Sequence, residues 1–263
     1  MLSVTACGGT AAEEAATAKE AAATKEAATA KEAAATDETG SSGEIKISFQ
    51  DHTEEVKAKD GTLLVTVKTT LPEVEIPGNE SAASAINEYM QTIDLTGITM
   101  GDAREWAQSD YEVRGADNWN AYAIETKYTA ERADSAVISF AGDAYSYMGG
   151  AHPNALRGGY NFDPAAGRRY TLADVVREEQ SARESILAFL TEETAKEQYA
   201  DMLFEDYTES LGDVLTEDTW YLGADGFHII VNEYIISPHA AGIMDFVLPY
   251  EKADFLKENF ILD

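Results

Sequence analysis

Stretches in which hydrophobic and polar residues alternate begin at residue 45 and recur to the end of the chain. In residues 45–49, Ile, Ile and Phe alternate with Lys and Ser, which is the period of two expected for a half-buried strand. Asp60-Gly61 is a turn signal, and the β-branched run from Leu63 to Val74 predicts the second strand of a hairpin. The same criteria predict strands at about 120–132, 135–147 and 156–162, a return strand through Tyr170, and strands at 220–223, 227–232 and 243–250.

Other segments repeat hydrophobic residues at the spacing of a helix. Residues 80–93 carry Ala, Ile and Tyr side chains on one helical face. Ser181 and Glu184 have the spacing of a capping box, so their side chains can satisfy first-turn amides of a helix that runs to about Gln198. A closing helix is predicted over residues 250–259. The three tryptophans are expected in the core: Trp106, Trp119 and Trp220.

This mixture of hairpins and helices has no regular alternation of strand and helix, which indicates an α+β fold. We expect two packed subdomains, residues 44–147 and 148–263, built from antiparallel sheets with helices on one face. The chain of 263 residues is 44% hydrophobic, which is enough for such a core. Its single cysteine excludes an intrachain disulfide, so stability must come from packing.

A low-complexity spacer over residues 8–43 precedes the predicted domains. Residues 11–36 are nearly all Ala, Thr, Lys and Glu, and residues 16–24 are repeated at 28–36. The repeat contains no Leu, Ile, Val or Phe, and its period of twelve matches neither a heptad nor an eleven-residue coiled coil. We therefore expect a partly helical spacer that ends in the turn-forming residues 37–43.

The N-terminal residues 4–9, Val-Thr-Ala-Cys-Gly-Gly, resemble a bacterial lipobox, in which Cys7 receives a diacylglycerol anchor. A signal peptide needs a basic start and an apolar run of roughly 7 to 15 residues, which residues 1–3 do not supply. We therefore interpret residues 1–7 as the remnant of a lipoprotein signal and expect an extracytoplasmic protein held on the cell membrane through Cys7. A chance cysteine near a cytosolic N-terminus is the alternative. No apolar run of about 18 residues is present to span a bilayer.

The charge of the chain excludes some classes of partner. Lys and Arg total 19 against 48 Asp and Glu, a formal net charge of -29, which opposes contact with nucleic acid or an anionic membrane surface. The first 36 residues hold three Lys and five Glu, so -27 belongs to the remainder. Such a charge attracts basic proteins from a distance, although solubility is a sufficient alternative explanation.

The sequence lacks the familiar catalytic motifs. There is no G-x-S-x-G, H-E-x-x-H, P-loop or G-x-G-x-x-G pattern. The four histidines, at positions 52, 152, 228 and 239, lie too far apart for two to serve as metal ligands on one helical turn. With 48 acidic residues, close carboxylate pairs are expected by chance. We therefore predict no enzymatic activity, no metal and no cofactor.

Several motifs after residue 144 carry a resemblance to an extracytoplasmic family of domains of unknown function. The motifs are Tyr-Ser-Tyr-Met-Gly-Gly-Ala-His-Pro-Asn at 145–154, Tyr-Asn-Phe-Asp at 160–163, Leu-Ala-Asp at 172–174, and the segments 227–234, 237–242 and 247–250. The resemblance covers roughly residues 44–255. Such domains are similar to the N-terminal region of PdaC-like peptidoglycan deacetylases and to the lysozyme-binding ectodomain of RsiV-like anti-sigma factors. The present chain lacks the deacetylase domain and the sigma-binding segment, so neither activity transfers whole.

The resemblance implies a non-catalytic module at the cell envelope that binds a basic wall-acting protein such as lysozyme. An alternative is binding of peptidoglycan or another wall glycan, and a second is an unrecognised envelope hydrolase or deacetylase. Binding of a basic protein should weaken steeply with salt, whereas stacking on a glycan should be nearly independent of salt. The sequence does not decide between the first two.

The candidate ligand-binding residues lie around the Gly-Gly-Ala-His-Pro motif: Tyr145, Tyr147, His152, Asn154, Tyr160, Asn161 and His239. Tyrosines at these positions can stack on sugars or anchor a protein, although alternate strand positions more often belong to a core. Pro153 forces His152 into an extended conformation, which predicts a tight loop. We expect His152 to bond to backbone groups that a buried loop would otherwise leave unsatisfied, and a joint pocket with His239 is the competing hypothesis.

Overall fold

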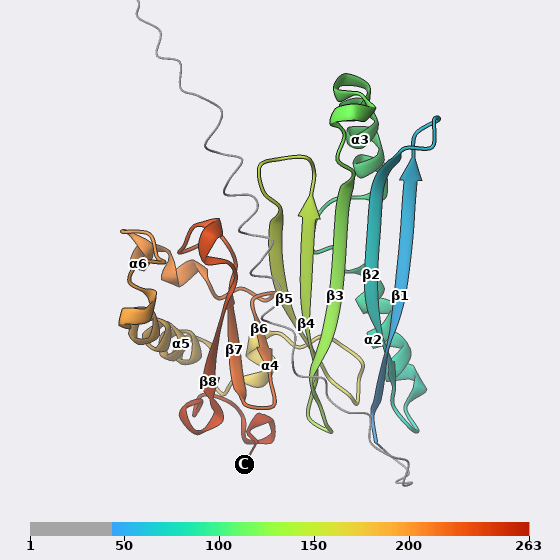
Figure 1. The fold of residues 1–263 in the computed structure, drawn as a ribbon. Coiled ribbons are helices and arrows are strands. Elements are labelled where there is room, and N and C mark those ends of the chain that lie inside the picture. The colour runs from blue at the N-terminus through green and yellow to red at the C-terminus, as the bar shows by residue number, and fades with distance from the viewer. Residues whose placement is uncertain (1–43, 263) are drawn as a thin grey trace, which may run out of the picture. The chain divides into compact units, whose positions relative to one another are not determined.

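Two β-sheets lie next to each other in the computed structural model, which describes residues 44–262 (Figure 1). The larger sheet has the order β1-β2-β3-β4-β5 and the smaller one the order β6-β7-β8. The strands of the larger sheet are β1 (Lys46–Lys57), β2 (Leu63–Glu75), β3 (Tyr122–Ala133), β4 (Ile138–Tyr147) and β5 (Asn154–Phe162). The strands of the smaller sheet are β6 (Trp220–Leu222), β7 (Gly226–Val231) and β8 (Met244–Pro249). The predicted α+β class is confirmed.

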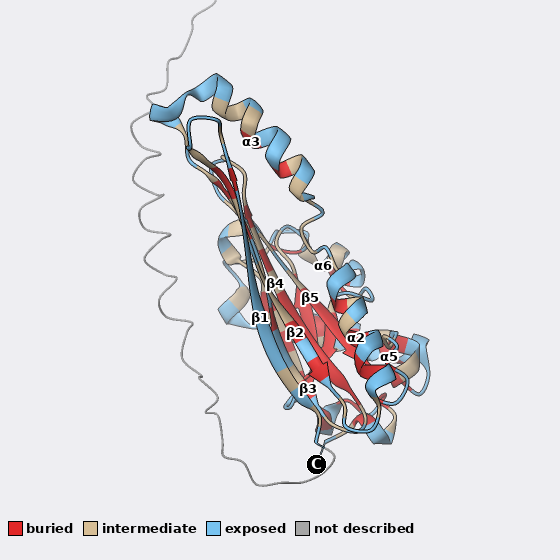
Figure 2. Ribbon diagram, turned by 90° about the vertical axis from the view of Figure 1, so that its right-hand side faces the viewer, coloured by how far each residue is buried: buried red, intermediate tan, exposed pale blue. Residues whose placement is uncertain are grey.

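Helices join the strands and cover the sheets. The α-helices are α2 (Glu80–Thr92), α3 (Met100–Arg114), α4 (Leu172–Val175), α5 (Glu179–Thr194) and α6 (Tyr207–Ser210). Short 3-10 helices lie at Ala116–Asn118, Glu197–Tyr199, Leu211–Asp213, His239–Ala241, Tyr250–Lys252 and Glu258–Phe260. Helices α2 and α3 lie on one face of the larger sheet, while β1 is largely exposed (Figure 2).

One strand pairing differs from the antiparallel arrangement that we expected. Strands β2 and β3 are parallel, with Val65 opposite Tyr122. Parallel neighbours need a long crossover, and the segment that contains α2 and α3 supplies it. Strands β4 and β5 pair antiparallel from Ile138–Phe162 to Ser146–Asn154. The boundary predicted between residues 147 and 148 therefore falls between two fully paired strands, and residues 44–262 lie within one compact unit.

Helix α3 was not predicted because it lacks an apolar stripe. It buries only small side chains, those of Ala103 and Ala107, and begins with a capping box formed by Thr99 and Asp102. Trp106 lies on this helix with 48% of its surface exposed, so its predicted core position is wrong. By contrast, α2 extends over the predicted residues and buries larger side chains against the sheet.

The predicted start of α5 and the predicted closing helix are corrected by competing hydrogen bonds. The carboxylate of Glu178 accepts from the backbone amides of the first turn, so α5 begins at Glu179 instead of Ser181 and ends at Thr194. Residues 250–260 form two short 3-10 turns instead of an α-helix. Their backbone bonds to the end of α4, where Lys257 N donates to the carbonyl of Val175.

The part of the chain seen in the structure contains no helix with the length and hydrophobicity required to cross a membrane. Cys7, with its predicted lipid, and the predicted spacer at residues 8–43 lie outside the described residues.

Candidate functional site

Two loops that are distant in sequence meet beside the start of β5. One follows β4 and contains His152, and the other joins β7 to β8 and contains His239. The two imidazole rings stack with their centroids 4.1 Å apart and their planes 19° apart. The ring of Tyr234 is nearly parallel to that of His239, at 6.4 Å. The structure therefore brings together two of the histidines that the sequence singled out.

The hydrogen bonds of the two rings define which nitrogen carries the proton. His152 Nδ1 lies 2.9 Å from the carbonyl oxygen of Pro153, so this nitrogen donates, because a carbonyl only accepts. The Tyr234 hydroxyl lies 3.4 Å from His152 Nε2, a long and weak contact. His239 Nδ1 is 2.7 Å from a carboxylate oxygen of Glu233. His239 is thus held firmly, whereas His152 is held only by its own neighbour and the stack.

Tyr234 has a backbone conformation that tyrosine rarely adopts. Its φ of 67° is the only positive φ of a non-glycine residue within residues 44–262. The amide of Tyr234 donates to the carbonyl of Ser237 at 2.9 Å, which closes the turn. The side chain is nevertheless 53% exposed, and the next residue, Ile235, is 40% exposed. Strain of this kind is retained at functional positions more often than elsewhere, at a cost of about 1–3 kcal/mol.

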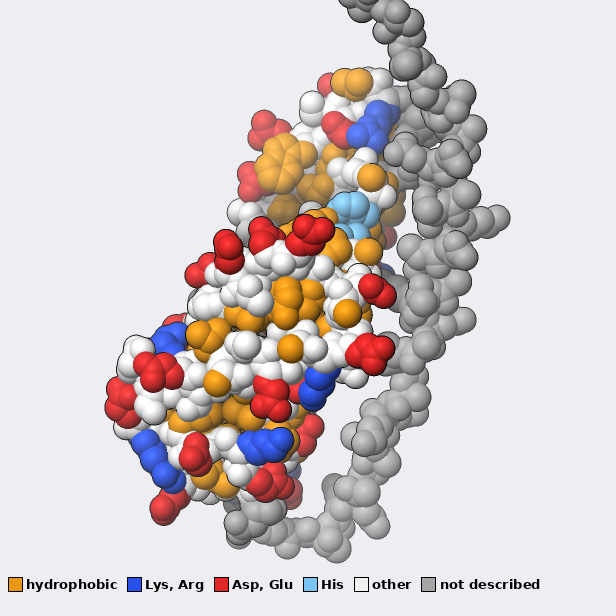
Figure 3. Space-filling view, turned by 90° about the vertical axis from the view of Figure 1, so that its left-hand side faces the viewer, with side chains coloured by type: hydrophobic (Ala, Val, Ile, Leu, Met, Phe, Trp, Pro, Cys, Tyr) orange, Lys and Arg blue, Asp and Glu red, His pale blue; other side chains and the backbone are white. Residues whose placement is uncertain are grey.

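A pocket of about 260 Å³ lies next to Tyr234. Strands β4 and β5 form its floor, and the loops before α3 and after β7 form its walls. Its lining residues are Thr96, Ile98, Ala144, Ser146, Asn154, Ala155, Leu156, Glu233 and Tyr234. On the face of the molecule shown in Figure 3, histidine side chains reach the surface among hydrophobic and acidic ones. We call His152, Leu156, Tyr234, Ile235 and His239 the histidine surface.

Not all predicted site residues belong to this surface. Asn154 lines the pocket, as do neighbouring residues of β5. Tyr145 and Tyr147 alternate with Ser146 along β4, so they occupy the opposite face of the sheet. His152 bonds to a backbone carbonyl, as expected, but the side chain is exposed and the loop is not the buried one that the sequence predicted. Its backbone partner is the adjacent residue, Pro153.

Tyr160 and Asn161 are buried and have structural contacts. The Tyr160 ring lies 4.9 Å from the Arg169 guanidinium. The Asn161 amide accepts from Ser139 Oγ and from the backbone amide of Leu222, and its Nδ2 donates to the carbonyl of Trp220. Asn161 therefore ties the two sheets together and has little capacity left for a ligand.

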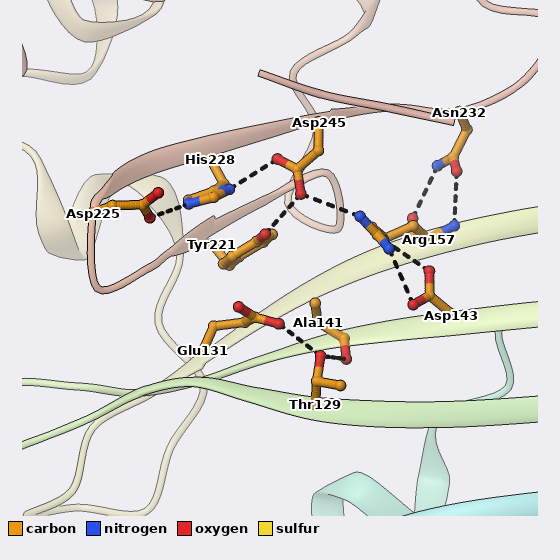
Figure 4. Close-up of polar contacts among 10 residues, drawn as sticks. All are labelled: Thr129, Glu131, Ala141, Asp143, Arg157, Tyr221, Asp225, His228, Asn232 and Asp245. Atoms are coloured by element: carbon orange, nitrogen blue, oxygen red, sulfur yellow. Dashed lines mark hydrogen bonds and ion pairs between the residues drawn. The ribbon is translucent and has the colours of Figure 1, made fainter. Parts of the chain in front are cut away.

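Sequence reasoning missed a buried polar network around His228 (Figure 4). His228 Nδ1 lies 2.9 Å from Asp245 and Nε2 lies 2.8 Å from Asp225. The hydroxyl of Tyr221 donates to Asp245 at 2.7 Å, and Arg157 donates to the same carboxylate oxygen at 3.2 Å. An aspartate within the apolar strand β8 was the sequence signal that could have revealed the network.

The pKa values in this network follow from burial and hydrogen bonds. Burial lowers the pKa of His228, but the bonds to Asp245 and Asp225 outweigh burial and leave it above the ordinary value. Burial raises the pKa of Asp245, yet bonds from His228 and Tyr221 leave it below the ordinary value. Both ring nitrogens of His228 are occupied, so it has no free nitrogen for a ligand or for proton transfer.

Arg157 extends the network from the smaller sheet into the larger one. Its guanidinium donates to Asp143 on β4, and its backbone exchanges two hydrogen bonds with the side chain of Asn232. These contacts connect β4 and β5 with the strands that bear His228 and Asp245. The network is therefore a structural joint. Over residues 44–262, no group of three or more His, Cys, Asp or Glu side chains is placed to hold a metal ion.

Comparisons with known proteins agree with this fold. A crystal structure of a DUF3298 family member from Bacteroides fragilis NCTC 9343 is 17% identical, over 83% of this chain and 96% of that one, with a TM-score of 0.63. A DUF3298 family protein from Pseudomonas aeruginosa PAO1 is 16% identical over the same shares of the two chains, with a TM-score of 0.50. At these identities the likeness shows the fold alone. No curated protein matches the sequence.

A family model matches a segment of the sequence that includes part of the candidate site. Residues 173–251 contain Tyr234 and His239, whereas His152 lies before them. The resemblance to PdaC-like deacetylases and RsiV-like anti-sigma factors stays a prediction. Residues 173–251 match the family model described as "Protein of unknown function (DUF3298)".

Proposed function

We propose that this protein is a non-catalytic, membrane-anchored module of the cell envelope that binds a basic wall-acting protein, such as lysozyme, through the histidine surface. The observation that carries the proposal is Tyr234, which is held at a φ of 67° and is 53% exposed. A residue with a strained backbone whose side chain served only to fill the core would be expected in the interior. The side chain of an exposed one contributes little to packing and is explained by a contact with a partner.

The chemistry of the surface suits a protein partner. Tyrosine is enriched among residues that dominate binding energy, and exposed apolar side chains exclude water around it. Leu156 and Ile235 are 38% and 40% exposed, so large apolar groups are available beside Tyr234. The two histidine rings are already stacked in the free protein, which lowers the cost of ordering them on binding.

The charge of the domain supports a basic partner. The histidine surface contains no Lys or Arg, and residues 37–263 carry a formal charge of -27. A field of this sign accelerates the association of a basic protein and is screened by salt. Nucleic acid would be repelled.

A catalytic role is disfavoured by the contacts of the histidines. A nucleophilic hydrolase needs a hydroxyl or thiol that bonds to a histidine with normal geometry. The hydroxyl that contacts His152 belongs to a phenol, and the distance is 3.4 Å. Glu233 orients His239 through Nδ1, but no hydroxyl or thiol of residues 44–262 bonds to its other ring nitrogen.

The test is a calorimetric titration of the full chain with lysozyme at low and high salt. Binding should be detected at low salt and should weaken at least tenfold at high salt. Tyr234→Gly removes the ring and relieves the positive φ, so we expect binding to weaken about 10- to 30-fold while the melting temperature does not fall. Phe49→Ala removes an aromatic side chain of similar exposure (43%) from β1 and should leave affinity unchanged.

The proposal fails if lysozyme does not bind at low salt or if Tyr234→Gly and Phe49→Ala bind with equal affinity. Salt-independent binding of soluble wall fragments, together with no binding of lysozyme, would also contradict it and would support a glycan module instead.

A further inference from the structure

The pocket beside the histidine surface contains two polar side chains that lack protein partners. Ser146 and Asn154 are directly opposite each other on β4 and β5, so both side chains project from the same face of the sheet. Ser146 is only 7% exposed, yet its hydroxyl makes no hydrogen bond to any residue in the range 44–262. The side-chain amide of Asn154 likewise bonds to none of the described residues. Asn154 is exposed, and the Ser146 hydroxyl is not among the fully buried atoms without a partner, so the hydrogen-bonding capacity of both groups is open to solvent or to a ligand.

The other walls of the pocket restrict the charge of a ligand. Ile98, Ala144 and Leu156 are apolar. Glu233 is the only residue with a formal charge among those that line the pocket, and its carboxylate is already bonded to His239 at 2.7 Å. A cationic or anionic ligand would lose its hydration without gaining an unpaired opposite charge. The lining therefore favours a neutral ligand with hydrogen-bonding groups and an apolar portion.

We infer that this pocket binds one neutral N-acetylated hexosamine ring. A serine hydroxyl and a primary amide can each donate and accept, which matches the N–H and C=O of an acetamido group. The apolar walls accommodate its methyl group, and the exposed Tyr234 ring at the rim is placed to contact the C–H face of a sugar. The volume of about 260 Å³ is below the range of about 300–1,000 Å³ typical of drug-sized ligands, so it suits a single ring.

This inference does not depend on capture of a basic protein. The pocket is defined by the polar side chains of Ser146 and Asn154 on strands β4 and β5, whereas the histidine surface is defined by exposed rings. The sugar site should therefore be nearly insensitive to salt, and binding of a basic protein should not be. Either proposal can fail while the other holds.

The experiment is a chemical-shift titration of the full chain with N-acetylglucosamine, glucosamine and glucose, each at millimolar concentrations. N-acetylglucosamine should shift the amide signals of Ser146 and Asn154 and saturate. Glucosamine carries a positive charge and glucose lacks the acetamido group, so both should bind at least tenfold more weakly. Saturation by all three sugars at equal concentrations would overturn the assignment of an N-acetyl site, as would the absence of any shift.

Two variants test whether Ser146 and Asn154 make the contacts. Ser146→Ala and Asn154→Ala should each weaken N-acetylglucosamine binding about tenfold, while Asn120→Ala, at an exposed position outside the pocket, should not. Ser146→Ala should keep the melting temperature, because the hydroxyl that it removes bonds to no residue in the range 44–262. Unchanged sugar affinity in both variants overturns the inference. So does a loss of lysozyme affinity in Ser146→Ala without any sugar binding, which would mean that the pocket receives a side chain of a protein.

Discussion

Within residues 44–262, the two places where a histidine bonds to a carboxylate are built in opposite ways. His228 is buried, both of its ring nitrogens are bonded to aspartates, and its neighbours connect the two sheets. His239 is bonded to one carboxylate, and its ring stacks on the exposed His152, which is held by a single local bond. Close contacts among ionisable groups therefore do not by themselves identify a functional site.

What separates the two places is whether the hydrogen-bonding capacity is used up. Around Asp245 three side chains converge on one carboxylate, and little is left for a ligand. Around the pocket, Ser146 and Asn154 remain without partners within the described range, and Tyr234 is both strained and exposed. A saturated network stabilises the fold, whereas an unsaturated one marks a surface that can bind.

The largest effect is expected when the saturated network is broken. Asp245→Ala leaves Arg157, His228 and Tyr221 without their shared acceptor, so we expect a loss of about 3 kcal/mol in the free energy of unfolding. Urea denaturation measures the loss, and Asp201→Ala, at an exposed position, is the control. A loss below about 1 kcal/mol would show that the network is not a structural joint.

A smaller loss of stability, which depends on pH, is expected when His228 is replaced. The folded-state pKa of His228 is raised, so its contribution to stability is complete below the unfolded pKa of about 6.5 and is lost as pH rises through the folded pKa. His228→Gln should therefore destabilise the protein most at about pH 6 and progressively less toward pH 9. Thermal unfolding of both proteins across this range is the measurement. A difference that stays constant with pH would contradict the pairing with Asp245.

The smallest effect on stability is expected at the open site. His152 is exposed and bonds only to the adjacent carbonyl, so His152→Ala should change the free energy of unfolding by less than about 0.5 kcal/mol. The same substitution should weaken binding of lysozyme, because it removes one of the two stacked histidine rings. A clear fall in the melting temperature would restore the structural interpretation that the sequence favoured.

Local patterns predicted the elements well, because alternation and turn residues act over a few positions. The hairpin of β1 and β2 was found in this way. Helix α3 was missed because Ala103 and Ala107 give no apolar stripe. The pairing of β2 with β3 was missed because parallel contacts depend on residues far apart in sequence.

The candidate site was predicted only in part, because sequence motifs are local whereas the contacts of the site join distant residues. His152 and His239 lie in recognisable motifs, so they were named before their contact was known. Ser146 has no signature in the sequence, and Tyr234 is recognisable only from its backbone angle. Asn161 was a candidate because of its motif, but its bonds across the two sheets give it a structural role.

The parallel contact between β2 and β3 also bears on how the chain reaches its native state. The β1–β2 hairpin and the β3–β4–β5 meander each form between strands that are adjacent in sequence. They join only when the segment 76–121 folds back to place Val65 beside Tyr122. Non-local pairing of this kind slows folding, although the closure entropy rises only slowly with loop length. We therefore expect the five-stranded sheet to assemble from two local pieces, whose union is the late step.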